Sequence, residues 1–529
     1  MLKRSAVPRG LREGSYEPVK HEGDDQTECG DSAEDDDHQA EGKHEGRGDD
    51  QVWRDDRDFQ DMIHDAVEQV GIVGGIHDCG DENEPGIDVV EWRTNFPMYG
   101  VKALGEHHIV VAGGGGHSKT GVPNCLEVYG LEYADKCPRL VKLGRMDTGN
   151  RATMNMDVFA VNPVDGNFLL ALGQDGNFLQ SNYDVVSVSN GVLVENSDLK
   201  KWQRRGSFRE TSTLSSTIDE RSDFKRKLGM AFSEIKTLQT DFTPANRHGG
   251  PFQKVVRFAP CGSFFVSGGS DGHFRVWAYP SFKKQLDHNA HKDDVDDLDI
   301  SRDSDLLVTV GRNGFTYIWR LNDCSKMAEL HGARMTAAGV SQKYRTRFAR
   351  FLFPEREGPF QLLVTCSIPV SRSTRKQACY LTLWRIEKRD GSCKSILSRS
   401  CGTEVISTMA VSKCSKYLGF GTLGGSLILV ETESLRTLNT WKQVHSIFVT
   451  SVDFLPTHPP ATSSFYPLVI HSPNVTLVSV SADNSCQLHV LDKSRCWSWP
   501  QLFLLFMMIS NLLYLYGKFT GSVFSIKMF

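Results

Sequence analysis

The spacing of hydrophobic positions divides the chain into three regions, of which the first is poor in apolar side chains. Residues 17–56 are acidic and polar, so they cannot bury enough apolar surface to offset the entropy cost of ordering. We therefore expect residues 1–94 to form an acidic, mostly disordered extension. Within it, apolar residues at spacings of three and four predict a short helix over 58–70. That helix either docks a partner or packs only locally.

From residue 95 to 492 the pattern changes to short β-rich runs separated by turn signals. The two clearest units, 255–277 and 295–319, end in tryptophans 42 residues apart (319 minus 277), Trp277 and Trp319. Each unit contains an Asp-Gly or Asn-Gly pair, beginning at Asp271 in the first, which suits a two-residue hairpin turn. A period of about 40–45 residues with four strands per unit is the spacing of WD repeats. With its weaker copies, the pattern predicts an all-β, seven-bladed WD-repeat β-propeller.

Polar residues that recur in these units are interpreted as structural. We expect His291, Thr309 and Trp319 to form a buried polar ladder that the turn residue completes, so His291 is not a catalyst. Two inserts, 195–230 and 456–475, are expected to be disordered loops. We further expect residues 476–492 to share a blade with N-terminal strands near 101–129, because closing the ring removes open sheet edges.

The third region is an uncharged hydrophobic segment near the C-terminus. Residues 501–517 are at the short end of the roughly 17–25 residues that a spanning helix needs. We predict one transmembrane helix there, preceded by a linker over 493–500 and followed by a short luminal tail over 518–529. The N-terminus lacks the apolar core of a signal peptide, and the 13 cysteines include no Cys-x-x-Cys pair. Both features predict a single-pass protein with its propeller in the cytosol and its C-terminus in the lumen.

Two motifs suggest enzymes, but their context argues against them. Residues 268–272 match the Gly-x-Ser-x-Gly of hydrolases, and residues 113–120 differ by one position from a phosphate-binding P-loop. Each is followed by strand-like sequence, whereas both motifs must be followed by a helix. The net charge of −5 and the lone basic segment 200–205 give no basic stripe for DNA. We predict no covalent catalysis, no small-molecule substrate and no nucleic-acid partner.

The glycine-rich loop Gly113–Asn124 needs a separate explanation. Runs of glycine are conformationally costly, so either this is an idle surface loop or its backbone adopts unusual angles or approaches something closely. Besides Asn124, the residues of interest in the loop are Gly113, Gly114, Gly115, Gly116, Gly121 and Pro123.

Three segments together resemble one known family. They are Val110–Asn124, Arg151–Asn155 with Leu172–Gly176, and Val308–Arg312. They are similar to the prolactin regulatory element-binding protein family, endoplasmic-reticulum membrane exchange factors that load GTP onto the small GTPase of the COPII coat. The resemblance covers roughly residues 96–516. The chain departs from the family in its long acidic extension and its short luminal tail.

The resemblance implies guanine nucleotide exchange at the endoplasmic reticulum membrane, starting vesicle budding and ER-to-Golgi transport. It also implies that a potassium ion shapes the loop through the backbone of Gly113–Asn124. Asn124 matches the asparagine critical for exchange, and we expect its amide to hydrogen-bond the GTPase. The alternative is a non-catalytic WD-repeat scaffold anchored in the same membrane, because most such propellers only bind proteins. A scaffold would have no use for the Gly113–Asn124 loop.

Overall fold

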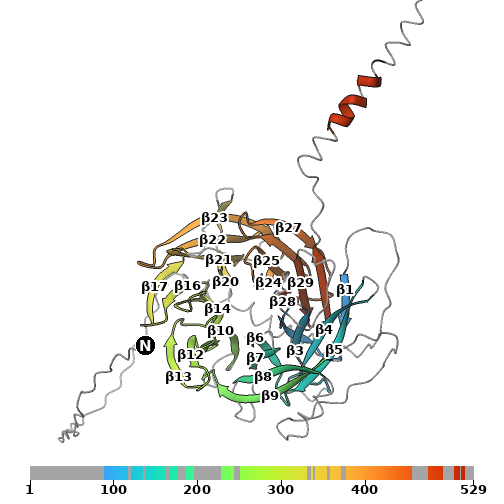
Figure 1. The fold of residues 1–529 in the computed structure, drawn as a ribbon. Helices are drawn as coiled ribbons and strands as arrows, with labels where there is room; N and C mark the ends of the chain where they lie inside the picture. The colour runs from blue at the N-terminus through green and yellow to red at the C-terminus, as the bar shows by residue number, and fades with distance from the viewer. Residues whose placement is uncertain are drawn as a thin grey trace, which may run out of the picture. The chain divides into compact units, whose positions relative to one another are not determined.

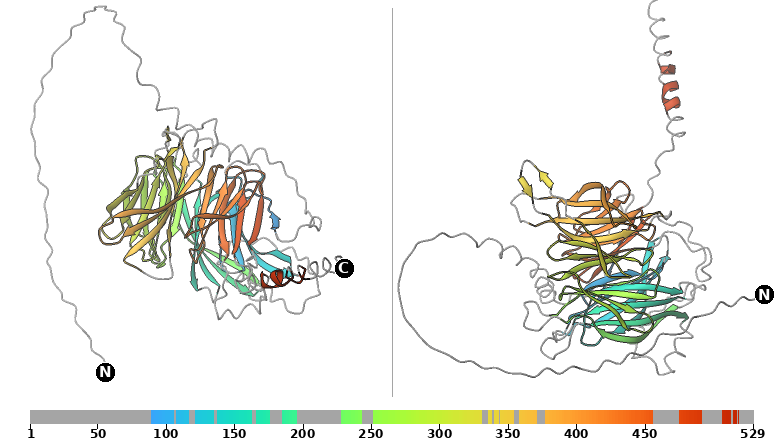
Figure 2. Two further views of the ribbon diagram at one scale, coloured as in Figure 1. Left: turned by 90° about the horizontal axis from the view of Figure 1, so that it is seen from above. Right: turned by 90° about the vertical axis from the view of Figure 1, so that its left-hand side faces the viewer.

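In the computed structural model, seven four-stranded antiparallel sheets of the described residues are arranged as the blades of a ring, which Figure 1 shows face-on and Figure 2 shows from two further sides. Each sheet has four strands, and one additional hairpin has two. This confirms the predicted seven-bladed propeller. The residues that the structure describes are 89–105, 107–116, 121–134, 137–162, 166–175, 185–195, 228–242, 251–330, 335–337, 340–342, 344–353, 358–370, 377–455, 475–491, 506–512, 514–516 and 518.

The first four blades follow one another along the chain. Blade 1 consists of β2 (Met98–Ala103), β3 (His108–Gly113), β4 (Cys125–Ala134) and β5 (Cys137–Asp147). Blade 2 consists of β6 (Thr153–Asn162), β7 (Asn167–Gln174), β8 (Val185–Glu195) and β9 (Leu228–Gln239). Blade 3 consists of β10 (Gln253–Phe258), β11 (Phe264–Gly269), β12 (His273–Ala278) and β13 (Lys284–Asn289). Blade 4 consists of β14 (Val295–Ile300), β15 (Leu306–Gly311), β16 (Thr316–Arg320) and β17 (Ser325–Leu330).

The remaining blades include the one that closes the ring. The hairpin of β18 (Met335–Ala337) and β19 (Val340–Gln342) precedes blade 5, which consists of β20 (Tyr344–Leu352), β21 (Phe360–Pro369), β22 (Cys379–Glu387) and β23 (Cys393–Gly402). Blade 6 consists of β24 (Ile406–Val411), β25 (Tyr417–Thr422), β26 (Leu427–Glu431) and β27 (Arg436–Trp441). Blade 7 consists of β28 (Val449–Leu455), β29 (Val475–Ser481), β30 (Ser485–Leu491) and β1 (Val89–Arg93).

The burial of each strand within its blade explains how apolar its sequence is. The second strand of blade 4, β15, is mostly apolar and its six residues are all buried, whereas the outermost strand of blade 3, β13, is mostly exposed. The core lies between neighbouring blades, where Phe274 of blade 3 packs with Leu298 and Trp319 of blade 4. The first strands of adjacent blades contact one another around the centre of the ring, which Figure 1 shows for β6, β10 and β14. A blade therefore cannot bury its apolar faces without its neighbours.

Aspartates on the inner strands tie one blade to the next. Asp157 of blade 2 accepts a hydrogen bond of 2.8 Å from the Phe258 amide of blade 3, and Asp299 of blade 4 accepts one of 2.8 Å from the Phe351 amide of blade 5. Asp453 of blade 7 accepts one of 2.8 Å from the Ala103 amide of blade 1. This last bond joins the two ends of the propeller, because the residues are 350 positions apart.

Ring closure differs from the sequence-based expectation. We predicted that residues 476–492 pair with strands near 101–129, but those strands form blade 1 together with β5. The closing strand is β1, which pairs antiparallel with β30 from Val89 opposite His489 to Arg93 opposite Ser485. The propeller therefore begins at residue 89, within the stretch that we assigned to the extension. A single five-residue strand at the end of a polar stretch becomes recognisable only once its partner is in place.

The predicted polar ladder is found in blade 4, except for its last member. Trp319 donates its indole N–H to Thr309 Oγ1 at 2.8 Å, and His291 Nε2 lies 2.9 Å from the same hydroxyl. The turn residue Asn313 instead accepts a bond from the Phe315 amide, and His291 Nδ1 has no partner among the described residues. In blade 3, Trp277 donates to Ser267 Oγ at 2.9 Å and Asp271 accepts a bond from Arg275.

The C-terminal segment is described only over 506–512, 514–516 and 518, which are helical. Their large apolar side chains are exposed. No helix within the described ranges is long and apolar enough to cross a membrane. The predicted helix over 58–70, most of each insert, the 493–500 linker and residues 519–529 lie outside the described residues.

Candidate functional site

The glycine-rich loop Gly113–Asn124 connects β3 to β4 in blade 1. It leaves the blade at the end where second strands finish and third strands begin, because Gly113 pairs with Cys125. Met98, the start of β2, and Asp147, the end of β5, lie at the same end. We call this end of the ring the loop face. Residues 113–116 and 121–124 are described, and residues 117–120 lie outside the described residues.

Several glycines of this loop are required by its backbone geometry, and Gly114 and Gly116 illustrate the reasons. Gly114 has a φ of +141°, and a Cβ there would lie 2.2 Å from Asn124 Oδ1. Gly116 has a φ of +69°, a left-handed conformation that other residues adopt at a cost. The glycine run therefore gives the backbone unusual angles and a close approach to Asn124. Gly113 ends β3, Gly115 lies between the two constrained glycines, and Gly121 and Pro123 lead back toward β4.

Asn124 holds the loop through side-chain hydrogen bonds to the backbone. Its side-chain Oδ1 accepts a hydrogen bond of 2.8 Å from the Gly116 amide, and its Nδ2 donates one of 2.9 Å to the Gly116 carbonyl. The same Nδ2 also donates to the Gly149 carbonyl at 3.1 Å, and the residue is only 7% exposed. This reciprocal pair holds the loop closed across eight residues.

The hydrogen bond expected from Asn124 to the GTPase stays a prediction. In the chain by itself, the side-chain nitrogen and oxygen of Asn124 are both bonded to backbone groups. A direct bond to a partner would have to replace one of these buried bonds, which costs free energy. Within the chain, the Asn124 side chain holds Gly116 against the base of the loop.

Two neighbouring segments complete the site. The connection between β5 and β6 supplies Gly149, and its Thr148 amide donates to the Asn124 carbonyl at 2.9 Å. Asp175, which follows β7 in blade 2, borders the loop, since a Cβ at Gly116 would lie 3.0 Å from its Oδ2. Burial, followed by the Asp175 carboxylate, raises the pKa of Tyr99 well above its usual value, so this tyrosine stays neutral.

Sequence reasoning identified the loop but missed its supports. Gly149 and Asp175 were not singled out as site residues, although Asp175 lies in the Leu172–Gly176 segment that resembles the family. Nothing local in the sequence signals that Gly149 meets Asn124 or that Asp175 meets Gly116, because strand pairing and the neighbouring blade bring them together. The family-like segments Arg151–Asn155 and Leu172–Gly176 are neighbours in space, since Arg151 Nη1 donates to the Asp175 carbonyl at 3.1 Å.

The chemistry available at this site is that of oxygen donors and a rigid backbone. Within the described part of the chain, no group of three or more His, Cys, Asp or Glu side chains could hold a metal ion. Peptide carbonyls and the Asp175 carboxylate suit hard cations instead. The two enzyme motifs are followed by β4 and β12, both strands, as the sequence predicted. The described ends of the loop, 113–116 and 121–124, are held by bonds within the chain and present backbone oxygens.

Comparisons with known proteins agree with the fold. The model of the WD domain, G-beta repeat, matches residues 247–278 and 282–320. The guanine nucleotide-exchange factor SEC12 of Rattus norvegicus is 31% identical over 440 residues, which cover 81% of this chain and 97% of the rat protein. The protein of the same name from Mus musculus is 32% identical, covering 76% of this chain and 91% of its own. SEC12-like protein 1 of Arabidopsis thaliana is 25% identical over 42% of this chain and 50% of its own length.

The two mammalian relatives align over nearly their whole length, so the likeness extends beyond the residues that the WD-repeat model matches. It also agrees with the resemblance found in the loop and its neighbouring segments. The chain belongs to the family of the guanine nucleotide-exchange factor SEC12.

Proposed function

We propose that this protein is a guanine nucleotide exchange factor for the small GTPase of the COPII coat and that it acts at the endoplasmic reticulum membrane. The relatives that show the family carry the name of exchange factor. The observation that carries the proposal is the Gly113–Asn124 loop, which is clamped by Asn124 at the loop face. A propeller that only scaffolds other proteins has no need for so constrained a glycine loop.

In the mechanism we propose, the loop acts by shape rather than by chemistry. A loop held in one conformation can press on the switch regions of the GTPase and weaken its hold on Mg²⁺ and phosphate. Because the hydrogen bonds of Asn124 fix the loop before binding, little ordering entropy is lost in the complex. Exchange then follows from preferential binding of the nucleotide-free state.

The family resemblance implies a potassium ion at this loop, and the residues present fit one. The Gly114–Gly116 backbone offers carbonyl oxygens, and the Asp175 carboxylate borders Gly116. These are the donors that hard cations prefer, so we propose that they would hold the ion. When bound, it would supply positive charge that stiffens an oxygen-rich loop.

We also propose that residues 501–517 anchor the chain in the membrane, with the propeller in the cytosol and the C-terminus in the lumen. The segment carries no charged side chain. Large apolar side chains in its described helical part, such as Phe506 and Leu515, are exposed. An anchor near the C-terminus would hold the propeller at the surface where a coat assembles.

The test is the release of a fluorescent GDP analogue from the COPII GTPase, with and without the purified full-length chain in detergent. The proposal is supported if GDP release is faster with the chain than without it, and if this acceleration is smaller when sodium or lithium replaces potassium. If the wild-type chain binds the GTPase without accelerating release, the scaffold alternative replaces it.

A further inference from the structure

Two exposed aromatic side chains lie on the loop face, away from the glycine-rich loop. Phe242, in the connection from β9 to β10, is 48% exposed, and Phe315, between β15 and β16, is 45% exposed. They are the exposed phenylalanines in the described part of the propeller. The connection from a fourth strand to the next first strand and the turn from a second to a third strand both lie at this face. Phe242 and Phe315 therefore lie at the same face of the ring as the Gly113–Asn124 loop.

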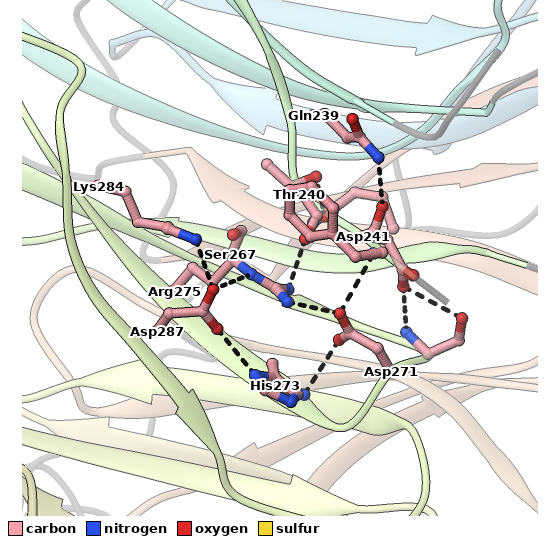
Figure 3. Close-up of polar contacts among 12 residues, drawn as sticks. Gln239, Thr240, Asp241, Ser267, Asp271, His273, Arg275, Lys284 and Asp287 are labelled. Carbon is pink, nitrogen blue, oxygen red and sulfur yellow. Dashed lines mark hydrogen bonds and ion pairs between the residues drawn. The ribbon is translucent and has the colours of Figure 1, made fainter. Parts of the chain in front are cut away.

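Phe242 rests on a rigid polar base. Its amide donates to Asp271 Oδ2 at 3.3 Å, and its ring lies 4.8 Å from the Arg275 guanidinium carbon and 5.5 Å from Lys284 Nζ. Figure 3 shows Arg275 at the centre of this base, bonded to Asp271 and Asp287 and to the Thr240 carbonyl. The buried Arg275 guanidinium thus holds the polar groups that surround Phe242 in one arrangement.

Phe315 is supported in a comparable way in the next blade. Its ring stacks on Tyr317 with centroids 6.1 Å apart and an interplanar angle of 14°. Lys326 Nζ lies 4.5 Å from the Tyr317 ring, whose stacking partner in the interior is His291. The Asn313 side chain fixes the Phe315 amide at 3.1 Å. Phe242 thus lies beside two cations, and Phe315 is linked to a cation through the Tyr317 ring.

The loop by itself is too small to be the whole interface. A specific protein interface engages roughly 20–30 residues on each side, whereas the loop has twelve (113–124). Rigid aromatic residues and arginines near the centre of such a surface usually carry most of the binding energy. Preorganised aromatic rings also lose little side-chain entropy on binding.

We propose that the aromatic rim, defined as Phe242, Arg275, Lys284, Phe315, Tyr317 and Lys326, is a second docking surface for the GTPase. This inference rests on the proposed function. The rim would receive a GTPase surface that presents an apolar side chain flanked by carboxylates. The apolar group covers the exposed rings, and the carboxylates pair with Lys284 and Lys326. The rim holds the GTPase while the loop acts on its nucleotide site, so affinity and maximal rate depend on different residues.

The test compares the full-length wild-type chain with a Phe242→Ala/Phe315→Ala variant. The rate of GDP release is measured against exchanger concentration. We expect the half-saturating concentration to rise about tenfold or more, since truncating an anchor residue typically weakens binding by that factor or more. The maximal rate should stay within twofold of wild type. The matched control, Ile396→Ala/Leu438→Ala, removes exposed apolar side chains from the outer strands β23 and β27 and should change neither value.

A direct binding measurement separates this inference from the proposed function. Biolayer interferometry with GDP-loaded GTPase measures affinity whether or not the wild-type chain accelerates exchange. An absence of acceleration would refute the proposed exchange function but not the rim. Weaker binding by the double phenylalanine variant, with a melting temperature equal to wild type, supports the rim. Unchanged affinity, or a fall in maximal rate with unchanged half-saturation, overturns it.

Discussion

Replacing Asn124 with alanine tests the loop most directly. The substitution removes three hydrogen bonds, with lengths of 2.8, 2.9 and 3.1 Å. It leaves the carbonyls of Gly116 and Gly149 and the amide of Gly116 without these partners. The backbone bond from the Gly114 amide to the Pro97 carbonyl remains, so the base of the loop stays attached. The expected result is a loop that samples many conformations on an intact blade.

The magnitude follows from the number of bonds. A buried hydrogen bond contributes about 0.5–1.5 kcal/mol net, so the clamped conformation loses roughly 1.5–4.5 kcal/mol. If only about 1–3 kcal/mol of this reaches the transition state for GDP release, the rate falls about 5- to 150-fold. The melting temperature should fall by a few degrees at most, because the loop opens locally and a large domain shifts little per kcal/mol.

The assay is GDP release from the COPII GTPase at saturating exchanger, together with thermal melting of each variant. Asn124→Asp keeps an oxygen to accept from the Gly116 amide but sets a carboxylate against two carbonyls, so we expect a loss at least as large. The control is Asn155→Ala, which removes a 2.9 Å amide bond to the Gln253 carbonyl between blades 2 and 3. It should lower the melting temperature without slowing release.

Two results would refute this reasoning. If Asn124→Ala releases GDP at the wild-type rate, the clamped loop is not the element that drives exchange. If Asn155→Ala slows release as much as Asn124→Ala does, the effect reports the stability of the propeller rather than the loop.

Four further predictions concern the fold and its placement. Deleting 89–93 should lower the melting temperature strongly, because β30 becomes an open edge, whereas deleting 1–84 should not; equal melting would contradict closure by β1. Thr309→Val should cost about 2–4 kcal/mol in urea unfolding, because it removes the hydroxyl that pairs with two buried groups; a loss below half of that would argue against the ladder. Burial lowers the pKa of His291 to about 4, so its unfolded form protonates first and this residue alone should lower the free energy of unfolding by about 1.4 kcal/mol per pH unit as the pH falls from 6.5 to 4. The buried His108, whose pKa is also lowered to about 4, adds to the total slope, so His291→Gln should reduce the slope by the contribution of one histidine, and an unchanged slope would contradict this. The chain should resist alkaline carbonate extraction through 501–517 and remain unglycosylated at Asn474, and a glycosidase-sensitive shift lost in Asn474→Gln would reverse the topology.

The amino-acid sequence was enough to identify the repeat and the candidate loop. The blades could be counted because their signals are local: a two-residue turn at Asp271, a tryptophan at a fixed distance and apolar runs of strand length. The Gly113–Asn124 loop was also recognisable, since four consecutive glycines are costly unless the backbone requires them. The structure gives that requirement at Gly114 and Gly116, whose φ values are positive.

The closure of the ring and the contacts of the loop depend on segments that the fold brings together. β1 is recognisable only beside β30, 400 residues further along where Val89 meets His489, and no local signal encodes such a pairing. For the same reason Gly149 meets Asn124 only because β5 pairs with β4, and Asp175 meets Gly116 only because blade 2 lies beside blade 1. Asn124 could be selected from sequence, but its hydrogen bonds within the chain could not, because the sequence does not show which groups its side-chain amide contacts. Two of those bonds go to Gly116 in the loop itself, and the third goes to Gly149 after β5.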